Sequence, residues 1–136
     1  MSNWAYDAET KVFSKAKAYI TSQLKTKYPK LNITQDGIIH EDAMLPSVLI
    51  HTIVSSETGQ DLVGQTINAI MYEVQVDVIV SHAQGLSVAK DVTGVVVDAF
   101  KRMSFSATMP TLDFEGNDTY RTVSRYNRII AQGDIL

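Results

Sequence analysis

The sequence predicts an α+β fold: a mainly antiparallel sheet of four to five strands with two helices packed on one face, in the order α-β-β-β-α-β-β. Two observations carry this prediction. Apolar residues recur at helical spacing near the N-terminus and again over 87–103. Residues 69–81 alternate between apolar and polar side chains and follow an apolar run over 46–55, so these two stretches are expected to form a long central hairpin.

The composition is that of one globular domain spanning residues 1–136. No apolar run approaches the ~20 residues that a membrane span needs, and the N-terminal residues lack the pattern of a secretory signal. The chain has no cysteine, which excludes disulfides, thiolate metal sites and a cysteine nucleophile.

We expect the first helix over residues 7–28, with Asp7 as its N-cap and Pro29 just beyond its end. Its outer face is rich in lysine. Its apolar stripe consists of Val12, Phe13, Ala16, Ile20, Leu24 and Tyr28.

A short strand is expected over 31–35, followed by a turn over 35–38. A polar loop over 56–68 then joins the two strands of the long hairpin. Twelve strand residues reach about 40 Å, whereas a compact chain of this size has a diameter of roughly 37 Å. The hairpin should therefore cross the whole domain, and we expect it to protrude.

The second helix is expected to begin with Ser87 as its cap, and Gly94 is expected to mark close packing against the sheet. Its apolar face consists of Val88, Val92, Val95, Val96, Ala99 and Met103. A strand over 108–114, broken by Pro110, a turn over 115–118 and a final strand over 119–132 complete the chain.

Charge is unevenly distributed along the chain. Six lysines and no acid lie from Lys11 to Lys30, which gives this segment a charge of +6. The net charge of the chain is −3, so the charges of all other residues sum to −9. A solvated helix face is the simplest interpretation. A basic segment can also bind nucleic acid or meet the acidic face of another copy. The negative total and the absence of interleaved aromatic residues favour a second copy over nucleic acid.

No catalytic or cofactor motif is complete. The segment 59–66 resembles a phosphate-binding loop, but Gln65 replaces the essential lysine, and the segment leads into a strand rather than a helix. Glu73 and Asp77 are four residues apart on one strand, ~13 Å, which is too far for a pair of glycosidase carboxylates. We therefore expect neither an enzyme nor a metal or cofactor site.

The three histidines, His40, His51 and His82, are widely separated in sequence and match no ligand spacing. His51 lies within an apolar strand and is interpreted as a residue of the core or sheet. The acidic pair Glu41-Asp42 is interpreted as solvated surface.

Three of the four arginines of the chain, Arg121, Arg125 and Arg128, fall in the final strand. They could protect a sheet edge, contact nucleic-acid phosphates, or meet acidic residues on this sheet or on another copy. We rank the setting of register with a partner first, edge protection second and nucleic acid third. On a regular strand Arg121 and Arg125 share one face and Arg128 the other, unless a bulge near 124–127 brings them together.

The arrangement resembles the tail terminator, or tail-completion, proteins of long-tailed bacteriophages. The resemblance rests on the stretches "SVLIHTIVS…NAIMYEVQVDVIVS", "SVAKDVTGVVVDAF" and "RTVSRYNRII", and on Arg121, Arg125 and Tyr126 in the last of these. It implies a single tail-terminator-like domain that is not an enzyme. Such proteins form a ring, usually of six subunits, which stops growth of the tail tube and offers a surface for joining the head.

The resemblance implies as partners other copies of the chain, the tail tube protein and a head–tail connector protein. DNA would only pass through the channel, no membrane would be involved, and the protein would be in the virion tail, or in the host cytoplasm during assembly. We expect Arg121, Arg125 and Arg128 to set subunit register with Glu73 and Asp77 as candidate partners. A contact loop for the tube or a neighbour is expected to include Thr58, Gln60, Asp61, Leu62 and Gln65.

Two alternatives remain open. One is another phage neck, connector or tail component of similar build. The other is a small oligomeric α+β domain that binds a ligand or acts as an enzyme, which a deep pocket with polar lining would favour.

Overall fold

The computed structural model describes residues 4–35, 45–60, 67–115, 119–131 and 133–136. Its elements are α1 (Trp4–Leu24), β1 (Asn32–Thr34), β2 (Ser47–Gln60), β3 (Ile67–Ser81), α2 (Gly85–Arg102), β4 (Ser106–Glu115) and β5 (Thr119–Ala131). This order confirms the predicted α-β-β-β-α-β-β arrangement.

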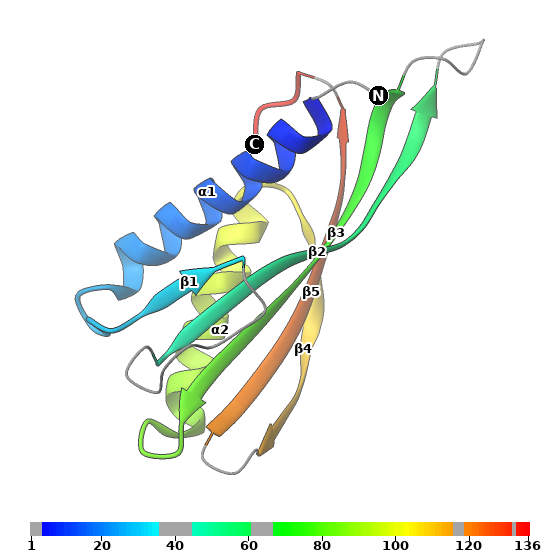
Figure 1. The fold of residues 1–136 in the computed structure, drawn as a ribbon. Helices are drawn as coiled ribbons and strands as arrows, with labels where there is room; N and C mark the ends of the chain where they lie inside the picture. The colour runs from blue at the N-terminus through cyan, green and yellow to red at the C-terminus, as the bar shows by residue number, and fades with distance from the viewer. Residues whose placement is uncertain (1–3, 36–44, 61–66, 116–118, 132) are drawn as a thin grey trace.

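The strands form one sheet in the order β1-β2-β3-β5-β4. β1 pairs with β2 in parallel, and the other three pairings are antiparallel, so the sheet is mixed but mainly antiparallel. Both helices lie on the same side of this sheet, as Figure 1 shows. The predicted two-layer architecture is confirmed.

The core lies between the helices and the sheet. The buried stripe of α1 has a spacing of four residues, which differs slightly from the predicted one, and comprises Ala8, Val12, Ala16, Ile20 and Leu24. The even-numbered residues of β3 from Ile70 to Val80 face the helices and join the same cluster. Phe100 of α2 stacks on Tyr126 of β5 with ring centroids 4.4 Å apart, and Phe105 meets Phe100 edge-on at 5.3 Å.

Tyr126 is fully buried in this core. Burial raises the pKa of its hydroxyl to about 12. The hydroxyl donates a hydrogen bond to Ser124 Oγ at 2.9 Å, which satisfies its donor.

The sheet face opposite the helices is called the outer face here; it carries the odd-numbered residues of β3 from Met71 to Ile79. At one end of this face Leu45, Leu49 and Ile79 form a second, smaller buried cluster. The outer face is therefore not a purely polar surface.

The β2–β3 hairpin is longer than predicted. Strand pairing extends to Gln60 and begins again at Ile67, so the predicted loop over 56–68 is wrong at both ends; residues 61–66 lie outside the described part. The pairing register shifts at Thr52/Val54, a β-bulge or similar irregularity. In Figure 1 the outer end of the hairpin lies apart from both helices.

Several predicted boundaries are shifted. α1 begins at Trp4, so Asp7 lies in its first turn rather than at the N-cap. The N-cap of α2 is Gln84 and not Ser87; Gln84 Oε1 accepts from Ser81 N–H at 3.0 Å, and Ser81 Oγ accepts from Gln84 N–H at 3.2 Å. The side chains that fix this turn thus lie before the apolar stripe of α2, where helical spacing gives no signal.

β4 is not broken at Pro110. It runs from Ser106 to Glu115, and only its pairing register with β5 shifts between Thr108 and Thr111. Because β4 is an edge strand, a residue without a backbone N–H is tolerated there. The predicted turns over 35–38 and 115–118 lie almost wholly outside the described residues.

Gly94 does not mark close packing against the sheet. It is exposed, and a Cβ placed on it would meet nothing within 4 Å. The buried residues of α2 lie on its other side and include Ala89, Thr93 and Phe100, which the helical spacing did not select.

We expect Gly94→Ala to raise the free energy of unfolding by about 0.5–1 kcal/mol, because alanine restricts the unfolded chain and favours the helix. Urea denaturation followed by circular dichroism would measure this change. A loss of stability would contradict the open environment of Gly94.

Candidate interaction surface

The pairing of β3 with β5 decides where the arginines lie. It continues without a register shift from Ala69↔Ala131 to Ser81↔Thr119, so β5 contains no bulge against β3. Arg121 and Arg125 therefore lie on the outer face and Arg128 on the helix side. β5 lies between β3 and β4, so the edge-protection interpretation is wrong.

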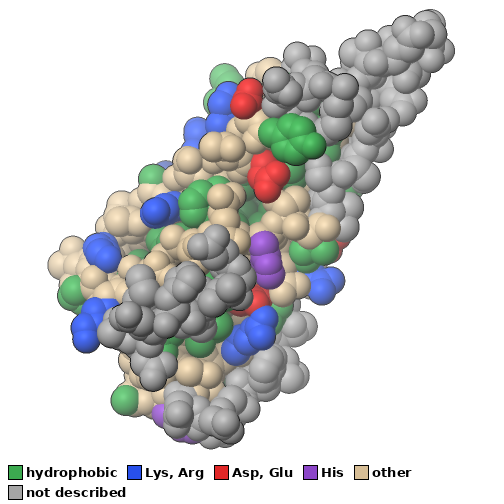
Figure 2. All heavy atoms as spheres, viewed as in Figure 1, with side chains coloured by type: hydrophobic (Ala, Val, Ile, Leu, Met, Phe, Trp, Pro, Cys, Tyr) green, Lys and Arg blue, Asp and Glu red, His purple; other side chains and the backbone are tan. Residues whose placement is uncertain are grey.

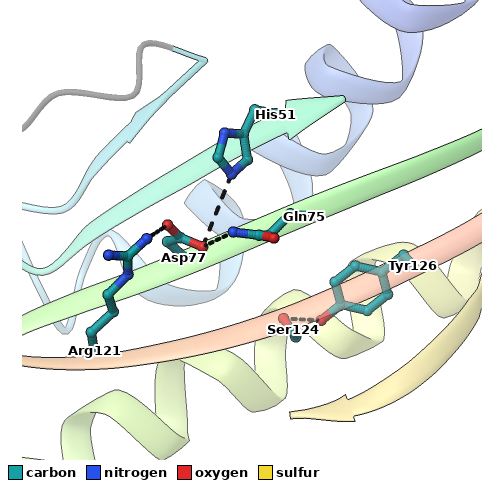
Figure 3. A network of polar contacts seen from close by, with 6 residues as sticks. All are labelled: His51, Gln75, Asp77, Arg121, Ser124 and Tyr126. Atoms are coloured by element: carbon teal, nitrogen blue, oxygen red, sulfur yellow. Dashed lines mark hydrogen bonds and ion pairs between the residues drawn. The ribbon is translucent and has the colours of Figure 1, made fainter. Parts of the chain in front are cut away.

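A polar network on the outer face surrounds Asp77, which is only 1% exposed (Figure 3). Arg121 Nη2 contacts Asp77 Oδ2, and Gln75 Nε2 donates to Asp77 Oδ1 at 2.9 Å. A buried carboxylate needs such donors, because removing its hydration without compensation costs several kcal/mol. The network therefore has a structural role within one chain.

His51 approaches the same carboxylate from β2. Its Nε2 lies 4.0 Å from Asp77 Oδ1, is buried, and makes no hydrogen bond. The sequence placed His51 correctly in the sheet but gave no reason to pair it with Asp77. The hairpin register supplies that reason: His51 lies opposite Gln75, next to Asp77 on the same face.

Arg125 is the most exposed of the three arginines. Its Nη1 lies 4.0 Å from Glu73 Oε1, and the two side chains are 53% and 34% exposed. A pair of this kind contributes ~0–1 kcal/mol to stability. Arg125 is therefore largely free to contact another surface without loss of the fold.

Arg128 makes different contacts. Its Nη1 donates to the backbone carbonyl of Met103 at 2.8 Å, just beyond the C-terminal end of α2. Its Nη2 lies 3.4 Å from Asp134 Oδ2, which also accepts from Ala131 N–H at 2.8 Å. Arg128 thus satisfies a carbonyl at the helix end and ties the C-terminal turn to the core.

Apolar side chains are exposed near the outer hairpin. Ile129 of β5 is 51% exposed and lies opposite Met71 of β3, and Ile53 of β2 is 43% exposed. Glu73 lies two residues from Met71 along β3, and Arg125 lies four residues from Ile129 along β5. This mixture of apolar and charged side chains is typical of a protein–protein interface.

Lysine and arginine side chains are spaced along the side of the molecule where α1 lies, as Figure 2 shows. Lys27 Nζ and Tyr28 Oη both donate to Asp91 Oδ2, at 2.9 and 2.8 Å, and so connect the chain after α1 to α2. These two hydrogen bonds hold the pKa of Asp91 below its usual value.

Two small hollows lie beside these lysines. One, of about 240 Å³, is lined by Lys17, Thr21, Lys25, Leu31, Asn32 and Ile33. The other, of about 260 Å³, is lined by Lys27, Tyr28, Pro29, Lys30, Leu45, Pro46 and Gln84. Both fall below the roughly 300–1,000 Å³ of typical small-molecule sites.

The predicted contact loop is only partly described. Thr58 and Gln60 lie in β2, whereas Asp61, Leu62 and Gln65 are outside the described residues. The segment resembling a phosphate loop leads into β3 and not into a helix, as the sequence predicted. Among the described residues no three metal-ligating side chains gather, and no helix is long and apolar enough to cross a membrane.

Neither a scan against models of protein families nor a search of curated proteins finds a match to this chain.

Proposed function

We propose that this chain is a tail terminator: a structural, non-enzymatic subunit of a ring, usually of six copies, that caps the tail tube of a long-tailed bacteriophage. The ring stops tube growth and offers a surface to which a head–tail connector protein binds. DNA passes through its channel, and the protein resides in the virion tail after assembly in the host cytoplasm. The family resemblance suggests this role.

The β2–β3 hairpin is the observation that carries the proposal. β3 alone has fifteen residues and extends about 50 Å, more than a compact domain of this size requires. The outer end of the hairpin lies apart from both helices (Figure 1). Pairing of β3 with β5 ends at Ala69, so only β2 and β3 continue to the Gln60↔Ile67 pair. A two-stranded hairpin is marginally stable in water, so this end of the arm is best explained by a second surface that it contacts.

The charge distribution supports assembly from unlike surfaces. Residues 4–30 contain six lysines and two acids, whereas residues 31–89 contain seven acids and neither lysine nor arginine. Ring closure uses heterologous contacts, in which one patch meets a different patch on the neighbour. One chain that carries separate basic and acidic segments provides both patches.

The mass of the purified protein, measured by light scattering after size exclusion and followed by negative-stain imaging, tests the ring. Closed rings with a central hole support the proposal, and a stable monomer or tight dimer at every concentration counts against it. Mixing with purified tail tubes then tests the position in the virion. Rings that bind a head–tail connector but leave tube growth unchanged would indicate a neck component instead.

Arg125→Glu should impair ring assembly while leaving the monomer folded, because this side chain is 53% exposed and its pair with Glu73 is weak. The fraction of protein in rings, with circular dichroism as a check on folding, measures the effect. Lys90→Glu makes the same change in net charge at an exposed position on α2 and serves as the matched control. Normal rings from the Arg125 variant would remove this residue from the interface.

A further inference from the structure

The hollow between α1 and β1 has the features of a docking groove for an extended acidic segment. We call it the lysine groove; its lining is Lys17, Thr21, Lys25, Leu31, Asn32 and Ile33. Lys25 Nζ donates to the carbonyl of Leu31 at 3.0 Å, and Lys17 Nζ lies 5.8 Å from the Phe13 ring centroid. In the described part of the chain neither lysine forms a salt bridge with an acid, so both charges remain available to a ligand.

One wall of the lysine groove is a strand edge. β1 is the first strand of the sheet and pairs only with β2. Asn32 N–H donates to the carbonyl of Pro46 at 3.0 Å. Because alternate residues of a parallel strand turn their peptide groups to opposite sides, the N–H and C=O of Ile33 point away from β2 toward the groove. A further strand can pair there.

A second strand edge lies on the hairpin. β1 covers β2 only at Ser47, Val48 and Leu49, so β2 from Ile50 to Gln60 has one edge beside which the described chain places no strand. We call this segment the hairpin edge. It includes one acid, Glu57, and neither lysine nor arginine. The lysine groove and the hairpin edge are therefore opposite in charge.

We propose that these two surfaces are the halves of one contact between copies: the hairpin edge of one subunit lies in the lysine groove of the next and adds a strand to β1. This inference rests on the ring proposed above and specifies how its subunits meet. The contact is heterologous, because the groove and the hairpin edge are different patches of the same chain.

The dimensions explain why such a contact is selective. β1 has three residues, and so short an edge strand protects a sheet against indiscriminate pairing. Two lysines beside it restrict the added strand to an acidic one, and like-charge juxtaposition excludes basic strands. The contact therefore needs both the strand edge and the lysines.

The absence of cysteine allows a direct test by disulfide formation between copies. Thr21→Cys in the groove and Thr58→Cys on the hairpin edge leave Lys17, Lys25 and Glu57 in place. The two single-cysteine variants are mixed and oxidised, and mixed dimers are counted by mass spectrometry. A disulfide requires Cα atoms within about 7 Å, so only apposed surfaces react efficiently.

We expect about tenfold or more mixed dimer over a matched control that pairs Thr58→Cys with Lys90→Cys on the exposed face of α2, since apposed thiols have a much higher effective concentration. The double reversal Lys17→Glu/Lys25→Glu should abolish the excess. Adding Glu57→Lys to the Thr58→Cys variant should restore part of the excess of mixed dimer.

The other outcomes are decisive in different ways. Rings that form while the cross-link stays at the control level overturn this contact but leave the proposed function standing. A chain that remains monomeric at every concentration and gives no cross-link overturns both. If the double reversal leaves rings intact but abolishes binding of a double-stranded DNA oligonucleotide, the groove is a phosphate site and the proposed contact is wrong.

Discussion

Arg121→Met should lower the free energy of unfolding by about 3 kcal/mol, because it leaves the carboxylate of Asp77 buried without its cationic partner. Asp77 is 1% exposed, so water cannot replace the guanidinium, and Gln75 provides one remaining hydrogen bond at 2.9 Å. His51 is the only other basic group that the described chain places beside this carboxylate, 4.0 Å away. Denaturant unfolding at neutral pH measures the loss.

The double variant Arg121→Met/Asp77→Leu is the control for this prediction. Replacing both members of a buried pair by apolar residues is often neutral or stabilising, so most of the lost stability should return. Leu49 and Ile79 already form an apolar cluster on the same face, which provides suitable neighbours for a leucine at position 77. Equal instability of the single and double variants would show that Asp77 stabilises the fold by another route.

Phe100→Ala should lower the free energy of unfolding by about 3–5 kcal/mol. The Phe100 ring is fully buried, stacks on Tyr126 at 4.4 Å and meets Phe105 at 5.3 Å, so its removal leaves a cavity where α2 packs on β5. Thermal and denaturant unfolding measure the change. Phe100→Leu keeps most of the volume and should cost clearly less.

A loss below about 1 kcal/mol for Phe100→Ala would mean that the neighbouring rings close the cavity. This prediction concerns the monomer alone, whereas Arg125→Glu concerns assembly. Comparing the two variants separates loss of folding from loss of association. Only Phe100→Ala should change the denaturant midpoint of the monomer.

The sequence by itself determined the features that depend on local spacing. Alternation over 69–81 gave the strand and the face of every residue on it, and the same parity argument separated Arg121 and Arg125 from Arg128. The order of elements and the long hairpin followed from the same spacing rules. The weak signals were the ends of elements, where single turns such as the Ser81–Gln84 pair decide the boundary.

Only the tertiary structure decided which strands are neighbours and which residues of the outer face are buried. The sequence marked Asp77 as an acid on the outer face, but its burial and its contacts with Arg121, Gln75 and His51 depend on β2, β3 and β5 lying side by side. The parallel pairing of β1, which creates the lysine groove, is equally long-range. Periodicity reports which side of its own strand a residue faces, whereas strand order and burial result from packing between segments distant in sequence.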